Sequence, residues 1–378
     1  MIDAVVVGAR CAGSATAIAL ARSGPSVVML DRVSFPADTI STHLLFPAGV
    51  AELARLGALD RVRELGAPPL RSALVGGAGV TAQATFTPVD GIDHGLCVRR
   101  PGLDAALMET ARAGGVDVRE GVRVTDLVWD KGRVVGVRCD GGDEVRAKLV
   151  VGADGRRSTV ARLVGSEGPY RQNRNGRACY YAYFADAVVG SSNNSVSEEA
   201  APNAVARSVA AQWRAGAELG TAFPCDDGLV MVLVMPPIER IDEFRSDLQG
   251  AYARTVEALA GLAGRLAGCE QVTKVRSATD TTSYFRRSSG PGWALPGDAG
   301  HFKDPVTAQG IRDALRFGRL LGQAAAPVLD DPHALDAALL EWERTREREC
   351  LETYQWTNAL GRGEPMTPLE DELYRRLA

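Results

Sequence analysis

Apolar and polar residues alternate along this chain in blocks that predict strands followed by helices. Residues 2–7 form a short apolar run, and residues 14–23 are rich in alanine with a helical repeat that stops before Gly24. A second apolar run, residues 26–30, ends at Asp31. A strand, a helix and a second strand within about 30 residues are typical of a βαβ unit of a parallel sheet. The beginning of the chain therefore predicts an α/β fold.

The same two patterns recur over much of the remaining sequence. Helical repeats predict further helices over residues 48–56, 103–113 and 335–357. Short apolar or alternating runs predict strands over residues 71–89, 116–119, 123–129, 133–139 and 149–152. Strand, turn and helix then follow one another again within residues 292–323.

A different pattern separates these regions. It predicts an aromatic strand at residues 180–184, a Ser-, Asn- and Glu-rich loop at 191–203, strands at 221–224 and 229–235, and a largely helical stretch at 238–266. We therefore expect two domains. Residues 1–70, 96–170 and 285–378 would form a nucleotide-binding domain with C-terminal helices, and residues 71–95 and 171–284 would form an inserted, sheet-rich substrate-binding domain.

Composition narrows the class of protein. The chain has 46% hydrophobic and 24% charged residues with a net charge of -4, which does not favour a nucleic acid or an anionic membrane as partner. Its 7 cysteines include no C-x-x-C pair, so we expect neither a disulfide framework nor a metal site, and a reducing cytoplasm. No apolar run approaches the ~18 residues of a membrane span, and the short apolar start after Asp3 does not resemble a signal peptide.

The first candidate site is the turn in "VVVGARCAGSATAIAL". Gly8 can form the turn and Gly13 can let the helix pack closely on the strand, as in loops that bind a pyrophosphate at a helix N-terminus. Asp31 lies at the distance expected of a carboxylate that binds a ribose hydroxyl. Arg10 occupies the place of the middle glycine, and many βαβ turns bind no nucleotide, so this turn alone leaves the question open.

Two further turns have the same form. In "VVGADGRRSTVARLVG" an apolar strand leads to Asp154 and Gly155, and in "GWALPGDAGHFKDPVTAQG" another leads to Gly297 and Asp298. The second turn is followed by a loop of small residues and a helix that we expect to begin near residues 307–311. Either turn could instead be an ordinary strand-to-helix connection with Asp or Ser as the N-cap.

Taken together and in this order, these motifs carry a resemblance to a known family. "GARCAGS", "LDR", "VRRPGLDAAL", "GADGRRSTVAR" and "LPGDAGHFKDPVTAQGI" resemble those of flavoprotein monooxygenases with the fold of para-hydroxybenzoate hydroxylase, and of their geranylgeranyl-reductase and flavin-halogenase relatives. The resemblance covers nearly the whole chain. It implies an FAD-binding, Rossmann-like domain of the glutathione-reductase type and a non-covalently bound FAD.

The resemblance also assigns cofactor contacts. Gly8, Gly13 and Asp31 would hold the ADP half, Arg100 would lie near the pyrophosphate and ribityl chain, and Asp298 would bind the ribityl region. The helix N-terminus after Pro305 would stabilise negative charge on the reduced flavin. The complete set of expected cofactor residues is Gly8, Arg10, Cys11, Ala12, Gly13, Asp31, Arg32, Thr42, His43, Arg100, Asp154, Gly155, Gly297, Asp298, Pro305, Ala308, Gln309, Gly310 and Ile311.

Two positions depart from the family pattern. Thr307 and Ala308 replace a frequent glycine pair, and we expect their Cβ atoms to require ordinary negative φ angles. Arg312 stands where many hydroxylases have Asn.

The relatives catalyse different reactions, so the fold does not decide the function. A halogenase would need a Trp-x-Trp-x-Ile-Pro motif and an early lysine, and neither is present because the first lysine is Lys131. The resemblance favours a monooxygenase in which NAD(P)H reduces FAD and O2 oxidises a small, aromatic or polyketide-like natural product. The alternatives are an alkene reductase of the geranylgeranyl-reductase type and a non-catalytic binding protein. We expect a monomer or homodimer without stable membrane association.

Residues of the substrate site are less clear from the sequence. In the strand "CYYAYF", alternation places Tyr181 and Tyr183 on one face and Tyr180 on the other. Trp213, Phe223 and Met231 or Met235 are further candidates for the same pocket. As catalytic residues we consider His43, His301 and Pro305, although each histidine could equally be a packed loop residue.

Overall fold

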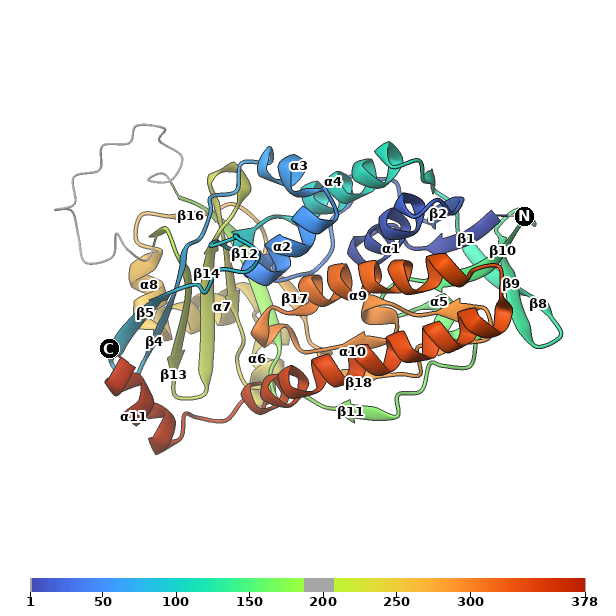
Figure 1. Ribbon diagram of the computed structural model, residues 1–378. Helices are drawn as coiled ribbons and strands as arrows, with labels where there is room; N and C mark the ends of the chain where they lie inside the picture. The colour runs from blue at the N-terminus through green and yellow to red at the C-terminus, as the bar shows by residue number, and fades with distance from the viewer. Residues whose placement is uncertain (1, 187–206, 378) are drawn as a thin grey trace.

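A computed structural model describes residues 2–186 and 207–377, and the predicted loop at 191–203 lies outside these residues (Figure 1). The first of two large sheets joins strands far apart in the sequence. In spatial order its strands are β19 (Ser289–Gly290), β20 (Trp293–Ala294), β10 (Glu144–Gly152), β1 (Ile2–Val7), β2 (Val27–Asp31) and β7 (Asp117–Glu120), with β8 (Val124–Asp130) and β9 (Arg133–Cys139) attached through β10. The pairs that join β20, β10, β1, β2 and β7 are all parallel, as expected from their short apolar runs.

Helices cover the first sheet on the side seen in the foreground of Figure 1, where α9 and α10 run beside each other. The helices of this part are α1 (Cys11–Arg22), α2 (Pro47–Arg55), α3 (Leu59–Arg63), α4 (Arg100–Ala113), α5 (Thr159–Leu163), α9 (Gly310–Ala325) and α10 (Pro332–Leu360). Helices α1 and α9 approach closely because Gly318 and Gly322 have no side chains: a Cβ atom at Gly318 would lie 2.6 Å from the carbonyl oxygen of Ala12. The glycines of α9 and the alanines of α1 that face them thus allow the close contact between the two helices.

The second sheet is formed largely by the inserted region and lies at the other end of the molecule in Figure 1. Its order is β16 (Glu270–Gln271), β12 (Cys179–Ala185), β15 (Leu229–Val234), β14 (Glu218–Pro224), β13 (Ala210–Ala215), β4 (Ser72–Gly77) and β5 (Val80–Thr85), with β17 (Arg276–Ala278) also paired to β12. Helices α6 (Ile241–Ser246), α7 (Leu248–Ala258) and α8 (Ala260–Arg265) pack on one face of it. Smaller sheets join β11 (Arg171–Asn173), β18 (Ser283–Phe285) and β21 (His301–Phe302), and β3 (Leu44–Leu45) with β6 (Leu96–Cys97).

The two sheets draw on the chain regions that the sequence pattern separates, while the domain boundaries themselves stay a prediction. The C-terminal segment differs in one respect from the expected division. Helix α11 (Pro368–Leu377) packs on β4 and β5 of the second sheet. Arg214 of the neighbouring strand β13 also pairs with Glu370 of α11 at 3.1 Å. The strand β13 has no counterpart among the predicted elements, because its sequence AAQWRA lacks both a clear alternation and a β-branched residue.

Four clusters of buried side chains form the core. One cluster lies on each face of the first sheet, and one on each face of the second sheet. Within the described ranges, no helix combines the length and the apolar character that crossing a membrane would require.

Candidate functional site

The three predicted turns meet at the carboxyl ends of adjacent parallel strands. Strands β1, β10 and β20 are neighbours, and the backbone N–H of Ala153 donates to the carbonyl of Val7 at 2.7 Å. A Cβ atom at Gly297 would lie 2.7 Å from that of Ala12, so the third turn touches the first helix. Ligands of open α/β sheets bind at this edge. The structure therefore brings the three motifs together as the resemblance implies.

Both glycines of the opening loop are required by close contacts. Gly8 has a φ of +102°, and a Cβ atom there would lie 2.5 Å from the carbonyl oxygen of Ala153. At Gly13 a Cβ atom would lie 1.7 Å from the carbonyl oxygen of Gly8. Gly8 thus forms the turn and Gly13 allows the close packing, which are the two roles predicted from the sequence.

The N-terminus of α1 presents free hydrogen-bond donors to this edge. The N–H groups of Cys11, Ala12 and Gly13 form no hydrogen bond with the residues that the structure describes, and no side chain caps the helix. Together with the positive end of the helix dipole, such donors form a binding site for a phosphate group. This cradle fits the pyrophosphate of FAD.

Asp31 lies at the end of β2 and faces the same loop. Its Oδ2 accepts from the N–H of Ala9 at 2.8 Å and its Oδ1 from the N–H of Val33 at 2.9 Å. Each oxygen retains a further lone pair, so the carboxylate can still bind a ribose hydroxyl as predicted. Arg32, the next residue, is exposed.

Arg10 adopts an ordinary φ of -81°, as expected for a side chain in place of the middle glycine. Its Nη1 donates to Oδ2 of Asp104 at 2.5 Å and to the carbonyl of Ala37 at 3.2 Å. Arg100 also binds Asp104, with its Nη2 at 2.8 Å from Oδ1. Asp104 is fully buried, and two arginines compensate its charge. The guanidinium of Arg10 is thus held by a carboxylate rather than reaching into solvent.

Asp154 is expected either to contact a nucleotide or to belong to an ordinary strand-to-helix connection. Its Oδ1 accepts from the hydroxyl of Ser158 at 2.5 Å and its Oδ2 from the N–H of Thr159 at 2.7 Å. Ser158 is the N-cap of α5, and Gly155 has a φ of +81° that suits glycine. Asp154 therefore organises the start of α5 in the described structure, and its contact with a nucleotide stays a prediction.

Asp298 follows Gly297 in the third turn and is a partly buried carboxylate. Burial raises its pKa from 3.8 to about 6, partly offset by the nearby guanidinium groups of Arg156 and Arg100. No hydrogen bond to this carboxylate is found within residues 2–186 and 207–377. A hydroxyl-bearing chain such as the ribityl group would supply the missing donors.

This burial predicts a pH-dependent stability that an Asp298→Asn variant removes. The unfolded chain ionises Asp298 near pH 3.8, whereas the folded apoprotein holds the proton to about pH 6. The contribution of Asp298 to the unfolding free energy should therefore fall as the pH rises from about 4 to 6 and stay lower above it, by at most about 3 kcal/mol. Urea unfolding of the apoprotein between pH 4 and 8 should show that the wild type and an Asp60→Asn control lose this amount relative to Asp298→Asn as the pH rises. Parallel profiles of the three proteins would contradict it.

Thr307 and Ala308 replace a glycine pair of the family, and the sequence predicts negative φ angles at both. For Ala308 this prediction is wrong. This residue has a φ of +52° and a ψ of +35°, the left-handed conformation, where it follows the short 3-10 helix Pro305–Thr307. The conformation ends that helix and directs Gln309 and Gly310 into α9, so the tertiary structure requires it although alanine does not favour it. The N–H groups of Gly310 and Ile311 have no partner in the described part of the chain.

A bulkier side chain should reveal the strain at Ala308. We expect Ala308→Val to lower the unfolding free energy by about 2 kcal/mol, since a β-branched residue at positive φ is strongly disfavoured. Ala324→Val in α9 should cost only about 0.5 kcal/mol. Urea unfolding of the two apoproteins checks this difference, and equal losses would contradict it.

A buried aromatic group lies against the same loop. We call it the β12 cluster; it contains Leu44, Cys97, Tyr181, Tyr183, Phe223, Met231, Met235 and Ala308. His43 joins it from the segment before β3: its Nε2 lies 2.5 Å from the Tyr183 hydroxyl, and the two rings stack at 5.9 Å. Thr42, which precedes it, is also buried. The predicted separation of Tyr181 and Tyr183 from Tyr180 is confirmed, because Tyr180 stacks on Phe244 on the opposite face.

Two polar side chains at this cluster are available to a bound molecule. His43 Nδ1 forms no hydrogen bond with the described residues, and the Tyr181 hydroxyl has the guanidinium of Arg276 as its polar neighbour. Burial, with the neighbouring Arg100, lowers the pKa of His43 to about 3, so its ring is neutral at physiological pH. A neutral imidazole beside an aromatic face can accept or donate a proton to a bound molecule.

Trp213 does not belong to the β12 cluster, contrary to the prediction. It belongs to the cluster beneath α8 on the other face of the second sheet. Its ring fills the space left by glycines: a Cβ atom at either Gly76 or Gly261 would lie 2.3 Å from it. Trp213 shares its face of β13 with Ala211, since side chains two apart point the same way.

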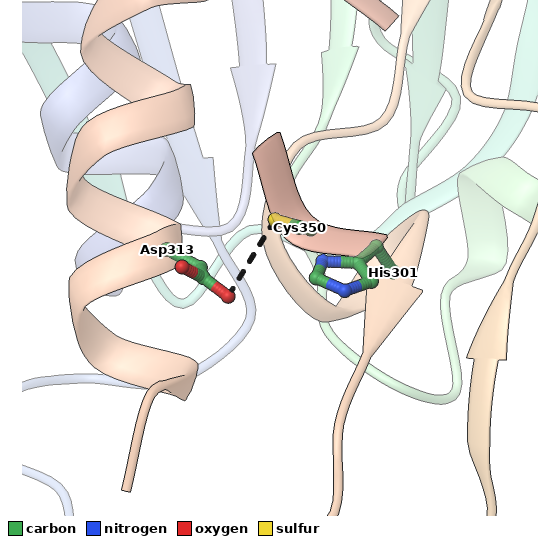
Figure 2. A group of neighbouring side chains, drawn as sticks. All are labelled: His301, Asp313 and Cys350. Atoms are coloured by element: carbon green, nitrogen blue, oxygen red, sulfur yellow. Dashed lines mark hydrogen bonds between the residues drawn. The ribbon is translucent and has the colours of Figure 1, made fainter. Parts of the chain in front are cut away.

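His301 is likewise separate from the β12 cluster. Its ring stacks on Phe285 with centroids 4.3 Å apart and lies near Asp313 of α9 and Cys350 of α10, as Figure 2 shows. The ligand atoms of these three buried residues lie within 4.8 Å of one another. Asp313, however, already pairs with Lys303 at 2.5 Å and Arg312 at 2.8 Å, and a metal ion would have to compete with these two cations. We therefore assign no metal to this group.

Sequence reasoning missed Asp104 as part of the site. The sequence signal was its position four residues after Arg100 in "RPGLDAAL", a spacing at which helical side chains meet. It could not show that Arg10, 94 positions earlier in the chain, reaches the same carboxylate.

Comparisons with known proteins find similar sequences over most of the chain. The family model described as FAD binding domain matches residues 1–356. Menaquinone reductase of Mycolicibacterium smegmatis is 31% identical over 333 residues, which are 85% of this chain and 75% of that protein. Rifampicin monooxygenase of Streptomyces venezuelae is 27% identical over 347 residues, 88% of this chain and 68% of that protein.

Solved structures share the fold. The myxobacterial chondrochloren halogenase superposes with a TM-score of 0.80 at 25% identity, covering 99% of this chain and 88% of the other. PqsL of Pseudomonas aeruginosa, described as a probable FAD-dependent monooxygenase, superposes with a TM-score of 0.79 at 20% identity, covering 100% and 99% of the two chains.

Proposed function

The chain belongs to the FAD-binding domain family and is an FAD-dependent oxidoreductase, and on this premise we propose that it is a monooxygenase. In the proposed reaction NAD(P)H, a proton, O2 and an organic substrate give NAD(P)+, water and the oxygenated substrate. The bound FAD would supply the redox chemistry, and the protein would hold the substrate in a dry site.

The β12 cluster is the observation that carries this proposal. Ala308, from the loop expected beside the flavin, packs in one buried cluster with Tyr181, Tyr183 and Phe223. An aromatic, water-poor face next to the cofactor loop suits an aromatic or polyketide-like substrate. His43 Nδ1, which lacks a partner among the described residues, and the Tyr181 hydroxyl would orient it.

Labelled oxygen tests the proposal. Purified holoprotein would be incubated with NADH or NADPH, 18O2 and a panel of aromatic and polyketide-like compounds, and products would be analysed by mass spectrometry. We expect one compound to accelerate NAD(P)H oxidation and O2 uptake and to gain one labelled oxygen atom. A product that gains two hydrogens under anaerobic conditions, and no oxygen in air, would contradict it.

That contrary outcome would support the second candidate, a flavin-dependent alkene reductase. The observation in its favour is the 31% identity to a menaquinone reductase over 85% of this chain. The anaerobic arm should therefore include a quinone with an unsaturated side chain, with the chemically reduced protein as electron donor.

A further inference from the structure

The segment of residues 32–41, which we call the strap, joins two predicted cofactor contacts. It begins after Asp31, expected at the adenosine ribose, and ends before Thr42 and His43, expected at the ribityl chain. In the part of the chain that the structure describes, no backbone group of the strap bonds to another backbone group. Its attachment therefore depends on side chains, which makes it a segment of low local stability.

Arg10 makes the central attachment of the strap. Its Nη1 donates to the carbonyl of Ala37 at 3.2 Å, its Nη2 to the carbonyl of Asp38 at 3.3 Å, and its guanidinium lies 5.4 Å from the centre of the Phe35 ring. Asp104 holds the same guanidinium from below, inside the protein. One planar, forked group thus connects a buried carboxylate with two carbonyls of the strap, which a lysine could not do.

Beside the contact of Asp31 with Val33, two other side chains attach the strap. Glu120, at the end of β7, accepts from the N–H of Phe35 at 2.6 Å, and Phe35 packs partly against the core of the first sheet. From the second sheet, Arg276 of β17 pairs with the carboxylate of Asp38. Asp38 is therefore bound through its carbonyl by the cofactor loop and through its side chain by the substrate-side sheet.

We propose that Arg10 retains FAD by fastening the strap, as a positioning residue, rather than by contacting the pyrophosphate. The guanidinium already spans Asp104 and the strap carbonyls, and the phosphate cradle is provided by the N–H groups of α1. Releasing the middle of the strap frees both of its ends, so FAD leaves faster. The inference depends on FAD binding and not on whether the reaction is an oxygenation.

FAD release from the holoprotein tests the proposal. After dilution, the rise of free FAD fluorescence gives the dissociation rate constant. Arg10→Gly and Arg10→Lys should both release FAD about tenfold faster than the wild type, as expected from the loss of one or two net hydrogen bonds. Arg61→Gln, which changes an exposed arginine of α3 outside the site, is the control and should release FAD at the wild-type rate.

The lysine variant separates the two roles of Arg10. If Arg10→Lys keeps the wild-type rate and its salt dependence while Arg10→Gly releases FAD faster and with a weaker salt dependence, the arginine acts as a charge on the pyrophosphate and the proposal is wrong. If Arg10→Gly, which restores the middle glycine, binds FAD as well as or better than the wild type, the proposal is also wrong.

Arg276→Gln provides an independent arm, because this residue attaches the strap from the other sheet. We expect faster FAD release and faster tryptic cleavage after Arg32 in both Arg276→Gln and Arg10→Gly. Unchanged release and unchanged cleavage in Arg276→Gln would overturn the role of the strap. Neither FAD release nor tryptic cleavage requires turnover. A failed monooxygenase assay would therefore not affect the test of the strap.

Discussion

Alanine at position 13 is expected to lower the affinity for FAD about 100-fold, equivalent to about 2.7 kcal/mol. The added Cβ atom would lie 1.7 Å from the carbonyl oxygen of Gly8, a backbone atom that cannot rotate away. Helix α1 would have to move away from β1, and the N–H groups of Cys11, Ala12 and Gly13 would move with it. Titration of the apoprotein with FAD, followed by flavin fluorescence, measures the loss.

One other glycine provides a matched control, and another provides a second probe of the cofactor site. Gly168→Ala adds a methyl group where no atom lies within 4 Å, and it should change neither FAD affinity nor stability. Gly310→Ala also meets no protein atom, so a loss of FAD affinity there would report on the space needed by the cofactor itself. Wild-type affinity in Gly13→Ala would remove the opening loop from the FAD site.

Loss of the Tyr183 hydroxyl is expected to lower turnover about 100-fold if the chain is a monooxygenase, because this hydroxyl holds the His43 ring that would orient the substrate and small misplacements can cost about that much. The Tyr183→Phe substitution leaves both ring nitrogens of the buried His43 without a partner in the described structure. An unsatisfied buried polar group should also lower the unfolding free energy by about 1–3 kcal/mol. FAD affinity should change much less than turnover, because Tyr183 itself is not among the expected cofactor contacts.

Tyr180→Phe is the matched control, since Tyr180 belongs to the same strand but faces the other side of the sheet. It should retain both turnover and stability. Turnover would be measured as substrate-stimulated NAD(P)H oxidation and stability by urea unfolding. If Tyr183→Phe loses stability but keeps its turnover, Tyr183 has a packing role only, and the pair with His43 does not take part in the reaction.

Local patterns predicted the turns and the two glycines of the expected cofactor site well. The βαβ unit, Gly8, Gly13 and Asp31 follow from short-range rules, because a tight turn and a helix N-terminus depend on neighbouring residues. The alternation in "CYYAYF" likewise assigned Tyr180 and Tyr181 to opposite faces. The same rules failed at Trp213, because nothing local shows which face of an unrecognised strand points to the cofactor.

Long-range contacts explain the remaining differences. Ala308 takes a positive φ because the chain must turn there from the 3-10 helix into α9, and its own propensity is overruled. Asp104 was missed because its two cationic partners come from different elements. His301 stood next to a cofactor motif in sequence, yet its ring packs between Phe285, α9 and α10.

The sequence by itself determined that the chain forms an α/β fold with three strand-to-helix turns, and the motifs in those turns indicated FAD. These features depend on residues close together in the sequence, because glycine conformation and the helix N-terminus determine each strand-to-helix turn. Only the tertiary structure decided how Arg10 is used. Its acceptors, Asp104, Ala37 and Asp38, lie 27 to 94 positions away in the sequence, and their convergence is a property of packed strands and helices that no local pattern contains.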